Sequence, residues 1–145
     1  AGLQNKYLKI DLASDKISVI DLKIAYNKIE KSLISCFDFN FNQSCYILGT
    51  YSQKIYLIDS RNDKTSQILK NHHTGGVNSL KFLKNSNMFL SGARKDNNIF
   101  LFDIRNVKQP VSSFYRNNDT YQKLNFCLNK KEEVLFCGNT VSIAF

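Results

Sequence analysis

Three side chains in the second half of the chain, His73, Ser91 and Asp96, are of the types that share protons through hydrogen bonds. A carboxylate that orients an imidazole beside a hydroxyl can activate a serine nucleophile. The sequence lacks the Gly-x-Ser-x-Gly turn that exposes such a serine, and Ser91 falls inside a predicted strand. The same trio can form a buried network in which the carboxylate fixes the imidazole tautomer and the hydroxyl satisfies its other nitrogen. We therefore predict a structural role for the trio and no enzymatic activity.

Short β-strands must position this trio, because residues 89–105 read as two apolar runs around a polar turn. Apolar runs of about 4–8 residues bounded by Gly, Asn and Asp predict a β-hairpin. The same pattern recurs along the chain, which predicts an all-β fold, with residues 23–31 as a polar connection of some helical character. The predicted strands cover residues 6–12, 16–22, 33–40, 45–50, 55–59, 65–69, 77–83, 88–92, 99–104, 111–115, 121–129, 134–138 and 140–145.

A fixed period relates these strands. An Asp ends a strand at three equivalent places, with spacings of 48 and 44 residues, and a Gly ends the second strand of three successive units, with spacings of 43 and 46. Four short strands in a repeat of about 40–45 residues are typical of a WD40 propeller blade. The repeated residues are Asp11, Asp59 and Asp103, and Gly49, Gly92 and Gly138.

The fold class predicted from this period is a partial WD40 β-propeller of about three four-stranded antiparallel blades. Residues 1–145 are then part of a single propeller, with blade pieces at residues 1–22, 32–69, 73–116 and 120–145. A propeller closes with roughly 4–8 blades, so we expect the remaining blades to come from a longer chain or from a partner.

In WD40 proteins a loop His, a second-strand Ser or Thr, a turn Asp and a third-strand Trp form one hydrogen-bonded network. His73, Ser91, Asp96 and Phe102 fall at those places. Phe102 cannot donate a hydrogen bond, so the network should end at Ser91. The neighbouring units keep the strand pattern without this network, since Leu48 or Cys137 stands at the place of the serine.

The formal net charge of +8 favours contact with nucleic acid or another anionic surface. Only four of the 20 basic residues are Arg, and the richness in Lys, Asn and Ile equally fits a general compositional bias. No apolar run reaches the roughly 18–20 residues of a membrane helix, and residues 1–6 show no apolar core of a signal peptide. We expect no membrane association.

The four cysteines do not form a Cys-x-x-Cys pair or a zinc pattern, so we expect no metal and no cofactor. Each stands in an apolar run, which predicts buried free thiols in a reducing compartment, the cytoplasm or the nucleus. They are Cys36, Cys45, Cys127 and Cys137.

The turn Gly92-Ala93-Arg94-Lys95-Asp96 has one residue more than the common WD40 turn. Together with three other motifs it resembles the family of telomerase Cajal body WD-repeat proteins. The resemblance covers about residues 32–145 and, more weakly, residues 2–22. The other motifs are His73-Thr74-Gly75-Gly76-Val77, Phe102-Asp103-Ile104-Arg105 and Leu33-Ile34-Ser35-Cys36.

The resemblance implies an RNA-binding protein. Members of that family recognise a short loop motif, the CAB box, in small Cajal-body RNAs and in telomerase RNA. They contact the core proteins of these particles and escort them within the nucleus to Cajal bodies, in support of telomere maintenance. The alternative is a general WD40 scaffold, nuclear or cytoplasmic, that binds proteins and no RNA.

Loop RNA is read by aromatic stacking and by Arg and Lys contacts at a rigid edge. The candidates for such contacts to RNA or a partner lie in or near predicted turns, and they are Arg94, Lys95, Arg105, Tyr51 and Tyr115, with Tyr121 nearby. Arg94 has a structural alternative, in which its long side chain packs across a blade edge and holds a neighbouring loop. The alternative for Lys95 is a solvated turn residue with no ligand.

Overall fold

The computed structural model describes residues 6–24, 28–29, 31–42, 44–84 and 87–140, and every regular element among them is a strand. The predicted all-β fold is therefore confirmed. The strands are β1 (Lys6–Asp11), β2 (Lys16–Asp21), β3 (Lys23–Ile24), β4 (Lys28–Ile29), β5 (Ile34–Phe39), β6 (Cys45–Thr50), β7 (Ile55–Asp59), β8 (Lys64–Leu69), β9 (Val77–Phe82), β10 (Met88–Ala93), β11 (Asn98–Asp103), β12 (Ser112–Tyr115), β13 (Phe126–Leu128) and β14 (Leu135–Cys137).

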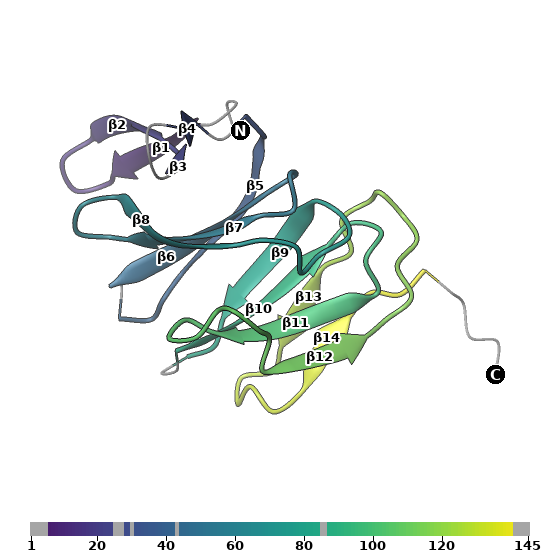
Figure 1. Ribbon diagram of the computed structural model, residues 1–145. Coiled ribbons are helices and arrows are strands. Elements are labelled where there is room, and N and C mark those ends of the chain that lie inside the picture. Colours follow the sequence, from purple (N-terminus) through teal and green to yellow (C-terminus); the bar gives the residue numbers. More distant parts are fainter. Residues whose placement is uncertain (1–5, 25–27, 30, 43, 85–86, 141–145) are drawn as a thin grey trace, which may run out of the picture.

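Two four-stranded antiparallel sheets form the centre of the molecule, with strand orders β5-β6-β7-β8 and β9-β10-β11-β12 (Figure 1). Each is a meander in which consecutive strands are neighbours, as expected for a propeller blade. Three two-stranded sheets, β1-β2, β3-β4 and β13-β14, complete the described part of the chain. Within the described ranges these sheets do not close into a propeller ring.

The predictions differ from the structure in two segments. Residues 23–31 were predicted to have helical character, but the described ones pair as the short hairpin of β3 and β4, because β-branched isoleucines favour extended backbone. The strand predicted at residues 121–129 is confined to β13, since the Gln122 N–H donates to Thr120 Oγ1 and holds a turn. Residues 141–145 of the last predicted strand lie outside the described residues.

The core lies between the sheets, because side chains alternate across each strand. In β6, Cys45 and Ile47 belong to a cluster shared with β9–β12, whereas Tyr46 and Leu48 pack on the other face with Tyr7 of β1. Both faces of the β5–β8 sheet are thus used for packing. Gly49 allows the close approach, because a Cβ there would lie 2.7 Å from both Cys36 Sγ and a Val77 methyl carbon.

The cysteines divide into two pairs. Cys36 and Cys45 are buried free thiols, and burial raises the pKa of Cys36 to about 11. Cys127 and Cys137 are exposed, so the prediction that all four are buried is wrong. The physical reason is that the apolar runs around Cys127 and Cys137 form the β13–β14 ribbon, which none of the described sheets covers fully.

Candidate nucleic-acid interface

The His73 side chain lies between Asp96 and Ser91. Its Nδ1 is 2.7 Å from Asp96 Oδ2 and its Nε2 is 2.8 Å from Ser91 Oγ. A carboxylate can only accept, so Nδ1 carries a proton, and in that tautomer Nε2 can accept a hydrogen bond from the Ser91 hydroxyl. Burial alone would raise the pKa of Asp96, but the hydrogen bond from His73, with those from Asn98 N and Thr74 N, holds it below its usual value.

All three side chains of this network are buried, and Ser91 has no exposed surface. Phe102, at the third-strand position, is also fully buried and stacks on Phe89 with ring centroids 5.5 Å apart. It has no donor, and the described hydrogen bonds of the trio end at Ser91. The network ties the β8–β9 loop to the β10–β11 turn.

The β10–β11 turn, residues 94–97, is held on both sides. Arg94 N donates to Gly76 O at 3.0 Å, and Lys95 N donates to Thr120 O at 3.1 Å. The Thr74 hydroxyl donates to Lys95 O at 3.0 Å. Lys95 has a φ of 47°, a left-handed conformation that is uncommon outside glycine. The surrounding hydrogen bonds therefore fix the backbone from which Arg94 and Lys95 project.

A cleft of about 310 Å³ opens beside this turn. The Arg94 guanidinium lies over the Tyr51 ring, 3.9 Å from its centroid, and its Nη2 donates to the Tyr51 hydroxyl at 2.6 Å. On the other side, Lys95 Nζ lies 4.1 Å from the centroid of the Tyr121 ring. The cleft is lined by Tyr51, Gln53, Thr74, Gly75, Gly76, Arg94, Lys95 and Tyr121.

The two cations of the cleft contact tyrosine rings and not carboxylates. In the described part of the chain, no carboxylate lies within ion-pair distance of Arg94 or Lys95. The nearby Asp96 is buried in the His73 network. The cleft therefore combines two aromatic rings with positive charge that no described acidic group neutralises, a combination suited to a planar or anionic ligand.

Three of the five candidate residues, Tyr51, Arg94 and Lys95, line this one cleft. Tyr115 lies on the edge strand β12, exposed, with its hydroxyl donating to Asn117 Oδ1 at 2.9 Å. Arg105 follows the opposite end of β11 and folds back on Asp103, with Nη2 2.6 Å from Oδ2. The structure therefore separates Arg105 from the cleft and leaves Tyr115 outside its lining.

The pairing of Arg105 with Asp103 is indicated by a spacing that occurs twice in the sequence. Asp59 and Arg61 repeat the same spacing, and Arg61 Nη2 likewise donates to Asp59 Oδ2 at 2.6 Å. Hydrogen bonds from Arg61 lower the pKa of Asp59 to about 2, and those from Arg105 lower the pKa of Asp103. The Asp-x-Arg repeat therefore marks self-paired arginines at blade ends.

The cleft residues that the sequence did not reveal are Gln53, Thr74, Gly75 and Gly76. The two glycines allow close approach, because a Cβ at Gly75 would lie 1.8 Å from Arg94 O and one at Gly76 would lie 2.9 Å from Tyr51 Cα. The glycine pair two residues after His73 was the available signal. The close approach that these glycines allow is made by turns that are distant in the sequence, so the sequence alone does not reveal it.

Metal-ligand clusters and membrane-spanning helices are both absent from the described residues. Those residues contain no group of three or more His, Cys, Asp or Glu side chains placed to hold a metal ion. They also contain no helix with the length and apolar character needed to cross a membrane.

The sequence of the chain is similar to those of known proteins. No protein-family model matches it. The sequence is 32% identical to Telomerase Cajal body protein 1 of Mus musculus over 114 residues, which are 79% of this chain and 21% of that protein. The chain thus spans about a fifth of the length of the curated relatives it matches.

The structure is similar to solved WD40 propellers. A chain in the crystal structure of the mitotic checkpoint complex matches with a TM-score of 0.77 and 13% identity, over 94% of this chain and 39% of that chain. The WD40 repeats of RRP9 match with a TM-score of 0.69 and 15% identity, over 81% and 34%. The predicted WD40 fold and the predicted resemblance are both confirmed.

Proposed function

The chain is a stretch of WD40 β-propeller similar in sequence to telomerase Cajal body protein 1, and from this premise we propose that it acts in a non-catalytic scaffold that binds a small Cajal-body or telomerase RNA. The partners include the core proteins of the same particle, and the proposed location is the nucleus, in Cajal bodies, with a role in telomere maintenance. Residues 1–22, 32–69, 73–116 and 120–145 are proposed to be pieces of a single propeller. The name of the relatives supports the telomerase and Cajal-body part of this proposal.

The observation that supports RNA as the ligand is the cleft beside the β10–β11 turn. Unpaired RNA bases stack on aromatic rings and the backbone is attracted to Arg and Lys. Tyr51 and Tyr121 supply two rings on opposite sides of the turn, and Arg94 and Lys95 supply the charge. Because the turn is fixed by hydrogen bonds to both neighbouring loops, this surface is ordered before a ligand arrives.

The four side chains have different roles in the proposal. Lys95 and Tyr121 are exposed and are proposed to contact a phosphate and a base. Arg94 is partly buried and bonded to the Tyr51 hydroxyl, which also fits a role in joining two blade edges. Arg105 and Tyr115 are proposed as lesser contacts to a protein partner, because they lie outside the lining of the cleft.

The proposal is tested by gel-shift binding of the full-length protein to a CAB-box hairpin and to the same hairpin with a mutated loop. Tyr121→Ala should weaken binding to the intact hairpin by about tenfold, since one base–aromatic stack is worth roughly 1–3 kcal/mol. Lys95→Gln should reduce the slope of affinity against salt by about one counterion. Lys108→Gln removes an exposed lysine beyond the other end of β11 and should change neither quantity.

Equal affinity for the two hairpins would contradict specific RNA recognition. The second candidate is then a scaffold that binds proteins only. The direct bond from Arg94 to Tyr51 favours that candidate, because it commits one of the two cations to an internal contact. Recovery of a discrete set of small RNAs crosslinked to the full-length protein would count against it.

A further inference from the structure

The Arg94 guanidinium has few donors left for a ligand. Its Nη2 donates to the Tyr51 hydroxyl at 2.6 Å, and its Nε is buried without a hydrogen-bond partner in the described part of the chain. Arginine grips a phosphate through two parallel N–H donors on one edge, and each edge that carries such a pair includes Nη2. A bidentate phosphate contact would therefore have to share Nη2 with Tyr51.

The flat face of the guanidinium is supported on one side. The central carbon lies 3.9 Å from the centroid of the Tyr51 ring, so the group covers that ring. Tyr51 is itself packed against the β8–β9 loop, because a Cβ at Gly76 would lie 2.9 Å from both its Cα and its Cδ1. Arg94 N donates to Gly76 O at 3.0 Å, which ties both residues to the same glycine. The opposite face of the guanidinium is the planar surface that Arg94 can offer to the cleft it lines.

Lys95 has no comparable support. Its Nζ lies 4.1 Å from the centroid of the Tyr121 ring, and in the described part of the chain no ion pair holds it there. Lys95 and Tyr121 are both exposed, whereas Arg94 is only partly exposed. An ammonium is a compact charge on a flexible stem, so it can leave the ring and follow a phosphate. The two cations are therefore suited to different parts of a nucleotide.

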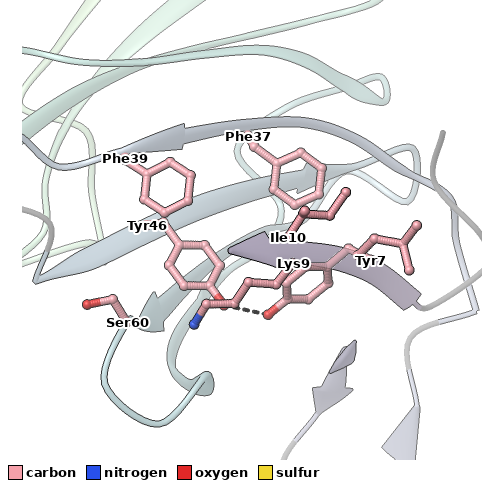
Figure 2. A pocket seen from close by; sticks show the side chains of 8 residues that line it. Tyr7, Lys9, Ile10, Phe37, Phe39, Tyr46 and Ser60 are labelled. Carbon is pink, nitrogen blue, oxygen red and sulfur yellow. Dashed lines mark hydrogen bonds between the residues drawn. The ribbon is translucent and has the colours of Figure 1, made fainter. Parts of the chain in front are cut away.

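A larger hollow, of about 490 Å³, lies beside β1, β5 and β6 and offers a contrast (Figure 2). In this hollow Lys9 Nζ lies 2.9 Å from each carboxylate oxygen of Asp63, and Tyr46 donates to the same carboxylate at 2.9 Å. Figure 2 shows the hydroxyls of Tyr7 and Tyr46 turned toward each other, and they are 2.5 Å apart. Aromatic rings and a lysine are thus present there as well, but their polar groups bind one another. The cleft differs because no described carboxylate lies within ion-pair distance of Arg94.

We propose that Arg94 is a stacking platform for one unpaired base of the bound RNA, and that Tyr51 positions it. Bases of loop RNA stack on guanidinium planes as well as on aromatic rings. A base on the free face of Arg94 completes a column of the Tyr51 ring, the guanidinium and the base, while Lys95 contacts the adjacent phosphate. This inference rests on the proposed RNA binding. It adds that Arg94 acts through its plane, where charge alone would make it interchangeable with lysine.

Arg94→Lys in the full-length protein separates the plane from the charge, because lysine keeps the charge and has no planar group. Gel-shift affinity for the CAB-box hairpin should fall about tenfold, as expected for the loss of one stacked base. The slope of log affinity against log salt should stay unchanged, since the number of cations at the cleft is the same. Arg61→Lys is the matched control. The Arg61 side chain is 82% exposed and pairs with Asp59 at the end of β7, so its substitution should change neither quantity.

Removal of single bases from the hairpin identifies the stacked nucleotide. Each loop nucleotide is made abasic in turn, which keeps the sugar and the phosphate. One abasic position should weaken binding of the unsubstituted protein about tenfold, as expected for one lost stack. The same position should cost Arg94→Lys less than about twofold, because its platform is already lost. Tyr51→Leu removes the ring beneath the guanidinium from a residue that is 38% exposed, and it should reduce the same abasic cost. It provides a second reading if Arg94→Lys does not fold.

Additive costs would overturn this inference. If Arg94→Lys and Tyr51→Leu weaken binding to the intact hairpin and to every abasic hairpin by the same factor, both residues act by holding the turn and not by stacking. Unchanged affinity of Arg94→Lys would equally overturn it, since charge would then suffice. Equal affinity of the unsubstituted protein for the intact and the mutated-loop hairpin would overturn the proposed function and this inference together. Specific binding with additive costs overturns this inference alone.

Discussion

The β5–β8 and β9–β12 sheets have the same strand order but are held at their centres by different interactions. In β5–β8, Leu48 faces Tyr56 across the strands and both side chains have no exposed surface. In β9–β12, the equivalent Ser91 faces Phe100 and bonds to His73. Apolar packing alone therefore suffices to build a four-stranded sheet of this type, and the polar network must serve a further purpose.

That purpose is visible at the β10–β11 turn. Six residues separate the paired Gly92 and Ile99, against five between Gly49 and Ile55 in the other sheet. Asp96 spans the longer turn, with one oxygen accepting from Asn98 N and the other from Thr74 N and His73. The network thus fixes the turn that carries the two cations of the cleft.

The largest loss of stability is expected when Leu48 of the β5–β8 sheet is replaced by serine, the residue that the β9–β12 sheet has at the equivalent position. Leu48→Ser removes a fully buried side chain and leaves a hydroxyl with no histidine to bind, so the full-length protein should lose about 4 kcal/mol of unfolding free energy. Chemical denaturation measures this loss. Leu12→Ser, at a position that is 89% exposed, is the matched control and should change stability by less than about 0.5 kcal/mol. A loss below about 1 kcal/mol at Leu48 would show that the sheet tolerates a polar centre without the network.

A smaller effect is expected from Asp96→Ala. The substitution leaves the Thr74 and Asn98 amides and the His73 Nδ1 proton without their acceptor, which should cost about 3 kcal/mol. The same denaturation experiment measures it, with the exposed Asp119→Ala as control. If the network fixes the turn, Asp96→Ala also increases hydrogen exchange at Lys95, and unchanged exchange there would contradict that role.

The smallest effect is expected in how the free energy of unfolding changes at acidic pH. The folded pKa of Asp96 lies below its usual value, so its ionised form contributes stability that is present above the unfolded pKa of about 3.9. This contribution is lost as the pH falls through the folded pKa. Denaturation between about pH 5 and pH 2 should therefore show a shallower loss of stability for Asp96→Ala than for the unsubstituted protein. Parallel curves would mean that Asp96 titrates alike in the folded and unfolded states.

Much of the fold follows from local patterns in the sequence. Alternation of apolar and polar residues placed most strands, and the recurring Asp and Gly positions supplied the blade period. The His73, Ser91 and Asp96 trio was also readable, because the three residue types have complementary donors and acceptors. The strand predictions failed at the short hairpin of β3 and β4 and at residues 121–125, where a local turn stands in place of the predicted strand.

The candidate site was only partly readable. Arg94 and Arg105 look alike in the sequence, as cations beside blade turns, yet only Arg94 joins the cleft. The pairing of Arg105 with Asp103 could be predicted from the sequence, since the two residues are close in the chain. The contacts of Arg94 with Tyr51 and of Lys95 with Tyr121 could not be predicted, because they join segments that are distant in the chain.

The sequence by itself determined the strands, their repeat and the polar network, because these depend on residue type and short spacing. Only the tertiary structure decided which of these residues are covered. Phe37 and Leu80 occupy the same place in the repeat, as do Phe39 and Phe82, and their exposures differ. Burial depends on the neighbouring sheet, which a strand's own sequence does not encode. The function that each surface can perform depends on the neighbouring sheet for the same reason.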